Sequence, residues 1–220
     1  MKVKDRMTTN VITISPDTNI TEAFRLMKEN DIRRLPVVDN EKLIGIITLT
    51  DLNQASPSSA TSLSIHELNY LLAKTKIKDI LPKKQNIVTV SPDAYIETAA
   101  KLMRRHTISG LPVMENDKVV GIITETDLFD SLIEILGVYE PHTRIDILVN
   151  DNRPGVLAEI TGLISSKNIN ILNAVGYYDK KINVYKVIIR IENLEYDSLV
   201  EEIKSRGYEI ESVIVRDTGE

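Results

Sequence analysis

The stretch Gly45-Ile-Ile-Thr-Leu-Thr-Asp-Leu52 occurs a second time, as Gly121-Ile-Ile-Thr-Glu-Thr-Asp-Leu128. The surrounding residues repeat as well: residues 13–52 align with 89–128 without a gap, and 21 of these 40 positions are identical. A duplicated unit predicts two copies that pack around a pseudo-two-fold axis and form equivalent clefts between them. Because the repeat keeps a Thr and an Asp at the end of an apolar strand, these polar side chains are candidates for function.

Each copy has the pattern of a β-α-β-β-α unit. In the first copy, a strand is predicted at 11–14 and a helix begins just after Asn19, which suits an N-cap. Apolar residues in this helix recur at helical spacing and predict one buried face. Two strands, at 35–38 and 43–48, complete the unit together with a helix that begins near Asp51.

An insertion of residues 55–76 separates the copies. Its first part, Ser56-Pro-Ser-Ser-Ala-Thr-Ser62, is typical of a loop. Ser64-Ile-His-Glu67 fits a capping box that opens a helix. The leucines of this helix (Leu68, Leu71 and Leu72) predict that it packs against the rest of the molecule.

The C-terminal region has a different pattern. Strands are predicted at 144–149, 169–178, 182–191 and 208–215, with helices after Pro154 and at about 195–206. The order β-α-β-β-α-β is the ferredoxin-like arrangement. The long apolar runs of 182–191 favour burial of that strand, and we expect it in a homodimer interface.

Composition narrows the class of protein. The 220 residues carry a formal net charge of −5, which argues against nucleic-acid and anionic-membrane partners. There is no Cys to form a disulfide, a thiolate nucleophile or a thiolate metal site. The first residues lack an apolar signal core, and no apolar run is long enough to span a bilayer. We expect a cytoplasmic protein.

The Leu35-Pro-Val37 and Gly45–Leu52 motifs, with their second copies, resemble CBS domains. The resemblance implies a CBS-domain pair over 1–136, with copy one at about 1–54 and copy two at about 77–136. Such pairs work in tandem, and many bind adenosine nucleotides (AMP, ADP or ATP) in clefts to which both copies contribute. No catalytic cofactor is implied.

By the family pattern, each cleft combines residues of both copies. One cleft would consist of Ile12, Ile32, Arg33, Arg34, Ile122, Thr124 and Asp127. The other would consist of Val88, Ile108, Ser109, Gly110, Ile46, Thr48 and Asp51.

The chemistry of these residues suits a nucleotide. A carboxylate such as Asp51 or Asp127 accepts hydrogen bonds from both ribose hydroxyls, and a Thr hydroxyl contacts the sugar or phosphate. The isoleucines of the strands pack against adenine. Arg33-Arg34 supplies donors for phosphate, with Arg104, Arg105 and His106 as further candidates, while Ser109-Gly110 permits close backbone approach to a base. The alternative is that each Asp only caps the helix that follows it.

The C-terminal region resembles an ACT domain over 144–216, after a linker at 137–143. The match rests on Asn150-Asp-Asn-Arg-Pro-Gly-Val-Leu157 followed by Asn168-Ile-Asn-Ile171. Amino-acid-binding members place the ligand near this loop, between two paired domains. The resemblance therefore implies a site at Asn150, Asn152, Gly155 and, from the partner chain, Asn170. The alternative is a dimerisation module whose asparagines only cap and turn the loop.

The order CBS–CBS–ACT resembles the acetoin-utilisation protein B (AcuB) family. The leading hypothesis is a regulatory sensor that passes ligand occupancy to a protein partner or an assembly state, in acetoin or related carbon metabolism. An assembly scaffold with vestigial clefts is the alternative. An enzyme is a third hypothesis, without a nucleophile–base pair or a metal cluster to support it. His66, His106 and His142 lack metal-ligand spacing and are expected to be ordinary surface or core residues.

Overall fold

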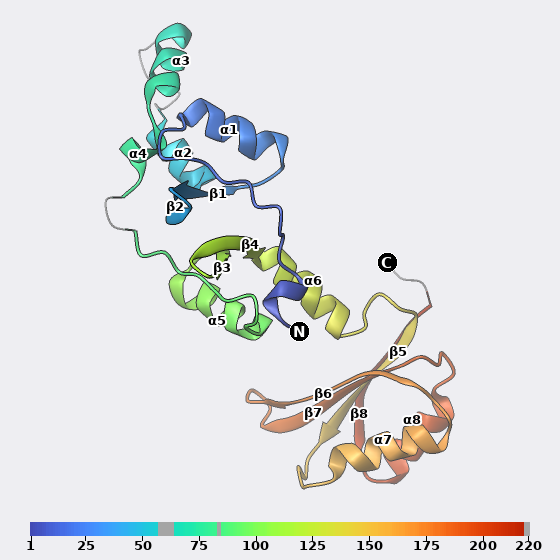
Figure 1. Cartoon of the computed structure of the whole chain (residues 1–220). Coiled ribbons are helices and arrows are strands. Elements are labelled where there is room, and N and C mark those ends of the chain that lie inside the picture. Colours follow the sequence, from blue (N-terminus) through green and yellow to red (C-terminus); the bar gives the residue numbers. More distant parts are fainter. Residues whose placement is uncertain (57–63, 83–84, 218–220) are drawn as a thin grey trace. The chain divides into compact units, whose positions relative to one another are not determined.

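The computed structural model describes residues 1–56, 64–82 and 85–217, except for the side chains of Ile65, Leu68 and Asn69. The chain divides into two units, Met1–Leu128 and Phe129–Glu220. Helix α6 (Glu125–Ile135) begins in the first unit and ends in the second. Figure 1 shows the course of the chain.

The first unit contains the two copies. Copy one consists of α1 (Ile20–Glu29), β1 (Arg34–Asp39), β2 (Lys42–Thr48) and α2 (Leu49–Ala55). Copy two consists of α5 (Ile96–His106), β3 (Gly110–Glu115), β4 (Lys118–Thr124) and the start of α6. Each strand pair is antiparallel with a bulge at the same place, between Val37 and Val38 and between Val113 and Met114. The repeat in sequence is therefore a repeat in structure.

The strand predicted at 11–14 is wrong as a full strand. Only Ile14 pairs, in an isolated parallel bridge with Val37, and the second copy repeats this with Val90 and Val113. The turn that begins at Ser15 ends the pairing after one residue, with Thr18 N–H bonded to the Ser15 carbonyl oxygen at 3.1 Å. The order β-α-β-β-α otherwise holds.

The segment before each copy packs into the opposite copy. The N-terminal 3-10 helix η1 (Val3–Asp5) places Val3 in the core of copy two, and α4 (Ile77–Ile80) places Ile77 in the core of copy one. The backbone contacts match: Val3 N–H donates to the Ala94 carbonyl at 2.8 Å, and Ile77 N–H donates to the Thr18 carbonyl at 2.8 Å. The two copies therefore hold each other together.

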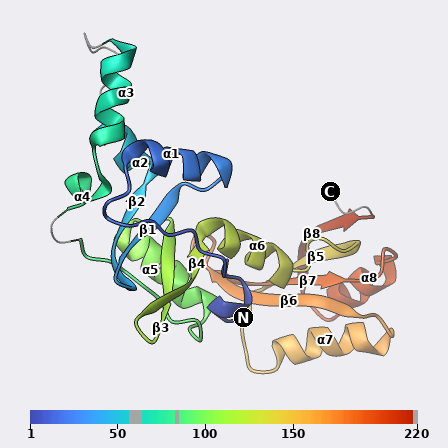
Figure 2. The same ribbon diagram turned by 45° about the horizontal axis from the view of Figure 1, so that its top comes forward.

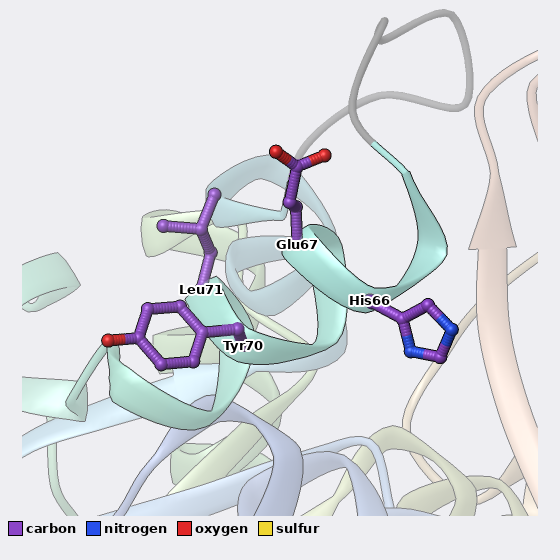
Figure 3. A pocket seen from close by; sticks show the side chains of 4 residues that line it. All are labelled: His66, Glu67, Tyr70 and Leu71. Atoms are coloured by element: carbon purple, nitrogen blue, oxygen red, sulfur yellow. The ribbon is translucent and has the colours of Figure 1, made fainter.

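The inserted helix α3 (Ile65–Lys74) has the expected capping box, with the Ser64 amide donating to Glu67 Oε2 at 2.9 Å. Leu72 packs against the core of copy one, but Leu71 is exposed, contrary to the expected packing. Leu68 lies outside the described side chains, and the predicted loop lies largely outside the described residues. Figure 3 shows a shallow hollow on α3, lined by His66, Glu67, Tyr70 and Leu71.

The second unit has the predicted β-α-β-β-α-β order in a mixed α+β fold. The elements are β5 (His142–Val149), α7 (Val156–Ser166), β6 (Ile171–Asp179), β7 (Val184–Ile191), α8 (Asp197–Ser205) and β8 (Glu209–Arg216). The antiparallel sheet has the order β6-β7-β5-β8, as in a ferredoxin-like fold. Helices α7 and α8 cover one face (Figures 1 and 2).

Two details of this unit differ from expectation. Helix α7 begins at Val156, so Pro154 lies before the helix and does not open it. The residue between them, Gly155, has a φ of 96°, which glycine adopts readily. Strand β7 lies inside its own sheet, between β6 and β5. Its apolar residues are buried by α7 and α8, so they do not by themselves indicate a dimer interface.

Candidate ligand-binding site between the copies

The repeated Thr and Asp form the same hydrogen-bonded turn at the end of β2 and of β4. Asp51 Oδ2 accepts from the Thr48 amide at 2.8 Å and from the Thr48 hydroxyl at 2.6 Å. Asp127 Oδ2 accepts from the Thr124 amide and hydroxyl, both at 2.7 Å. In each copy the Asp amide lies within hydrogen-bonding distance of the Thr hydroxyl, which closes a capping box in copy one. The turn thus fixes each carboxylate at a helix start.

Capping uses one carboxylate oxygen and orients the other. Both bonds to Asp51 reach Oδ2, and among the described residues none donates to its Oδ1. Asp51 and Asp127 are half-buried, so each carboxylate is partly accessible to solvent. The alternatives drawn from sequence are therefore compatible: one carboxylate can cap a helix and present an acceptor at the same time.

The Arg34 guanidinium connects the copies. Arg34 Nη2 donates to Ser109 Oγ at 2.7 Å. A Cβ built on Gly110 would lie 1.7 Å from Arg34 Nη1, so the guanidinium lies against the glycine backbone. Arg34 and Gly110 occupy equivalent positions of the repeat. The space beside Gly110, expected to admit a base, is thus filled by an arginine in this structure.

Arg34 lies in an environment that disfavours its charge. Burial lowers the pKa of its guanidinium, while the charges of Glu125 and Asp127 oppose the shift and Arg33 adds to it. The influence of Asp127 agrees with the expected grouping of Arg34 and Asp127. Glu125, one residue after Thr124, was not singled out in the sequence. Its acidic side chain in the first turn of α6 could have pointed to this role.

Backbone contacts link the elements that carry the first predicted group. Thr8 forms an antiparallel bridge with Ile122 and Ile14 a parallel one with Val37, so Ile12 lies on a segment that runs from copy two to copy one. This segment therefore connects the elements that carry the first group. Ile12, Ile32 and Ile122 are all half-buried, which leaves apolar surface on each of them accessible.

In the second predicted group, the side chain of Gln85 makes the corresponding link. The sequence analysis did not identify this residue. Gln85 Oε1 accepts from the Ile46 amide at 2.8 Å, and Gln85 Nε2 donates to the Ile46 carbonyl at 3.0 Å. The amide of Gln85 therefore replaces the backbone bridge that Thr8 makes with Ile122. Val88, three residues on, precedes the bridge of Val90 to Val113. Val88 and Ile108 are half-buried.

The remaining phosphate candidates are on the surface. Arg33 is exposed, and so are Arg104, Arg105 and His106 in the last turn of α5. Thr107 ends that helix with a left-handed φ of 54°. Among the described residues, no hydrogen bond or ion pair joins these four side chains to Asp51 or Thr48. Of the five cationic candidates, Arg34 alone makes a hydrogen bond to the other copy within the described part of the chain.

The predicted amino-acid site lies on an exposed loop. Asn150, Asn152 and Gly155 are exposed between β5 and α7. Asn170 Nδ2 donates to Glu192 Oε2 at 3.0 Å, and the Glu192 amide donates to the Asn170 carbonyl at 3.1 Å. The Asn170 side chain is therefore bonded within its own chain.

The histidines do not gather. His66 and His106 are exposed, and His142 is buried with Nδ1 2.6 Å from the Glu140 carbonyl oxygen. Among the residues that the structure describes, no group of three His, Cys, Asp or Glu side chains is arranged to hold a metal ion. Across the same residues, no helix is both long and apolar enough to cross a membrane.

Comparisons with known proteins agree with this architecture. The family model for the CBS domain matches residues 3–58 and 77–134, and the model for the ACT domain matches 143–208. The chain belongs to the CBS-domain family, as a tandem CBS pair followed by a C-terminal ACT domain.

The similar proteins match the CBS pair. A CBS domain-containing protein of Dictyostelium discoideum is 37% identical over 143 residues, which are 64% of this chain and 97% of that protein. An uncharacterized protein of Methanocaldococcus jannaschii is 33% identical over 61% of this chain but 45% of its own length. The chain thus spans less than half of some curated relatives.

A solved structure extends the likeness. It is that of a proposed acetoin utilization protein (AcuB) from Vibrio cholerae, which is 32% identical to this chain. The match covers 63% of this chain and 94% of that chain, with a TM-score of 0.51.

Proposed function

We propose that this protein is a regulatory sensor that binds an adenosine nucleotide between its two CBS copies. The observation that carries the proposal is the repeated Thr–Asp turn, in which Thr48 and Thr124 hold Asp51 and Asp127 through Oδ2. A carboxylate held in this way is preorganised to accept from the vicinal hydroxyls of a ribose. The apolar strand residues beside it, Ile46 and Ile122, supply surface for the adenine ring.

In this proposal the Thr positions the carboxylate. The Thr48 hydroxyl hydrogen is already directed at Asp51 Oδ2, so it is not available to a phosphate. Arg33 and Arg34 instead bind phosphate at the first site. Among the described residues, the hydrogen-bond partner of Arg34 is the neutral hydroxyl of Ser109, which an anionic phosphate replaces with a stronger, charge-assisted hydrogen bond.

The two sites are expected to differ. The first has two arginines, whereas Ser109 and Gly110 occupy the same positions at the second. The first site therefore suits the nucleotide with more phosphates, and the second suits AMP or an uncharged adenosine compound. Movement of Arg34 away from Gly110 on phosphate binding would also open space at the second site. Arg34 thus couples occupancy of the two sites.

The wider role extends this proposal. An amino acid binds near Asn150, Asn152 and Gly155, with Asn170 supplied by the partner of a homodimer formed through the exposed sheet edge at β6. Occupancy is passed to a cytoplasmic protein partner or to the assembly state, in acetoin or related carbon metabolism. The protein does not turn over the nucleotide, because neither Asp51 nor Asp127 is placed as a general base.

The second candidate function is an assembly scaffold. It is favoured by the capping role of Asp51, whose bonds to Thr48 account for the retained Thr–Asp pair without any ligand. On this account both proposed sites are vestigial, and substitutions there alter stability alone.

Calorimetric titration with AMP, ADP and ATP separates the two candidates. The sensor predicts saturable binding, with Arg34→Gln weakening ATP binding more than AMP binding. Arg25→Gln is the matched control, since Arg25 is exposed and pairs with Glu22 and Glu29 on α1. The absence of binding by all three nucleotides to a folded protein would favour the scaffold.

A further inference from the structure

The sheet of the second unit buries an arginine that has no acceptor. Arg190 in β7 is only 5% exposed, and its Nε is fully buried without a hydrogen-bond partner. Among the described residues, none accepts a bond from its side chain. Buried charges are ordinarily paired or hydrogen-bonded. This arginine therefore needs an explanation.

Alternation along β7 places Arg190 on the face away from α7 and α8, because its neighbours Ile189 and Ile191 belong to the core under those helices. Its direct partners across the sheet are Arg144 on β5 and Asn173 on β6. Arg190 thus lies between a like charge and a neutral amide, and neither partner neutralises it.

The carboxylate of Asp146, near Arg190, already accepts hydrogen bonds from other side chains. Arg144 donates to Asp146 through both Nε and Nη2, at 2.7 and 2.9 Å, and Ser212 Oγ donates to Asp146 Oδ2 at 3.1 Å. Arg216, on β8, lies opposite His142, the first residue of β5, in the strand register. Burial lowers the pKa of Arg190, and Arg144 and Arg216 lower it further against the opposing effect of Asp146. Three arginines therefore lie around Asp146, and Arg144 and Ser212 already occupy this carboxylate.

Asn173 provides a second unsatisfied group beside Arg190. Its Nδ2 donates to the Ile135 carbonyl at 2.9 Å, at the end of α6, while its Oδ1 is buried without a partner. The amide cannot compensate the arginine charge. The region is positively charged and partly desolvated. It lies next to the hydrogen bond by which Asn173 of the sheet contacts the end of α6.

We infer that Arg190, with Arg144 and Arg216, forms a binding site for an anionic oxygen group of a small molecule, a carboxylate or a phosphate, on the face of this sheet away from α7 and α8. The guanidinium fork of Arg190 matches either group with paired charge-assisted hydrogen bonds. This site shares no residue with the loop at Asn150 or with the Thr–Asp turns. It therefore does not depend on the proposed nucleotide binding.

The test titrates the full chain by calorimetry with inorganic phosphate and, separately, with succinate, at constant ionic strength. Saturable binding of at least one anion is expected. Arg190→Gln should weaken it at least tenfold, whereas Arg25→Gln, which changes an exposed arginine on α1, should leave it unchanged. Comparison of the two anions tells a phosphate ligand from a carboxylate ligand.

Three results would overturn the inference: no saturable binding of either anion, equal affinity in Arg190→Gln, or an equal loss in Arg25→Gln. If Arg190→Gln does not fold, Arg216→Gln decides, because Arg216 is exposed. That variant should fold and bind the anion several times more weakly. Unchanged affinity in Arg216→Gln would then reject the site.

Discussion

Arg34 of one CBS copy donates from Nη2 to Ser109 Oγ of the other at 2.7 Å and lies against Gly110, its own counterpart in the repeat. Positions that were equivalent after duplication now hold an arginine and a glycine, and the larger residue fills the space left by the smaller. The asymmetry is a direct consequence of divergence between the copies.

This packing predicts that Arg34 and Gly110 are energetically coupled. Gly110→Ala places a methyl group where the guanidinium lies, so Arg34 must move and lose Ser109. Because the group displaced is the end of a flexible side chain, we expect a cost of about 1 kcal/mol. In an Arg34→Ala background the same change should cost less, with a coupling energy of about 0.5–1 kcal/mol.

Denaturant unfolding of the four proteins in this cycle measures the coupling. Gly162→Ala is a control for adding a methyl group, since nothing lies within 4 Å of a Cβ at Gly162. Strict additivity of Arg34→Ala and Gly110→Ala would contradict the contact.

The segments at Val3 and Ile77, each of which packs into the opposite copy, predict where a truncation acts. Removal of residues 1–8 takes Val3 out of the core of copy two and deprives the Ile122 amide of the Thr8 carbonyl, 2.9 Å away. Amide hydrogen exchange should accelerate at Ile122 in β4. The corresponding Ile46 amide in β2 should change less, because Gln85 protects it. Faster exchange at Ile46 than at Ile122 would refute the arrangement.

The converse change affects the other copy. Ile77 is fully buried in the core of copy one, although it lies at the start of the segment that leads to copy two. Ile77→Ala should lower the free energy of unfolding by about 2–5 kcal/mol. The exposed neighbour Lys78 gives the control, as Lys78→Ala removes only a surface ion pair with Asp17. Similar losses for both variants, measured by urea denaturation, would be inconsistent with this packing.

Two carboxylates that pair with lysines of these segments predict an acid-dependent contribution to stability. Lys78 and Lys76 lower the pKa of Asp17 from 3.8 to about 2, and Lys4 and Lys2 do the same for Asp93. Because the folded-state pKa is below the unfolded value, the stabilisation is complete above about pH 4. It is lost as the pH falls through the folded-state value near 2.

Thermal melts of wild type, Asp17→Asn and Asp93→Asn between pH 7 and pH 2 check this. The difference between wild type and each variant should be constant down to about pH 4 and then shrink. It should also diminish in high salt, since these ion pairs are exposed. A difference that grows as the pH falls would have the wrong sign for this mechanism.

The sequence predicted the parts of this molecule that depend on local pattern. The repeated Gly-Ile-Ile-Thr stretch led to both CBS copies, and the motif at 150–157 and 168–171 led to the ACT domain. Apolar spacing predicts which face of an element is buried but not which copy buries it. The packing of Val3 and Ile77 into the opposite copies was therefore missed, although Val3-Lys-Asp5 and Ile77-Lys-Asp79 share one pattern.

The site was harder to predict for a related reason. The capping geometry of Asp51 follows from a local motif, and the sequence offered it as an alternative to ligand binding. That the cap uses only Oδ2 depends on side-chain orientation. The contact of Arg34 with Ser109 and the pairing of Gln85 with Ile46 join residues 75 and 39 positions apart. No periodicity along the chain reports such contacts.

The central claim is that Asp51 and Asp127 bind ribose, and Asp→Asn substitutions test it most directly. An Asn side chain can keep its amide oxygen on the Thr cap, so stability should change by less than about 1 kcal/mol. Its amide nitrogen then takes the place of the second carboxylate oxygen, and ribose loses a hydrogen bond to a charged group.

The decisive measurement is calorimetric titration of AMP into wild type, Asp51→Asn, Asp127→Asn and the double variant, with thermal melts of each. We predict that each single substitution weakens AMP binding at one site by about 10–150-fold, corresponding to about 1.5–3 kcal/mol. The folded double variant should bind AMP at neither site. AMP binding of wild-type affinity in the double variant would contradict the account.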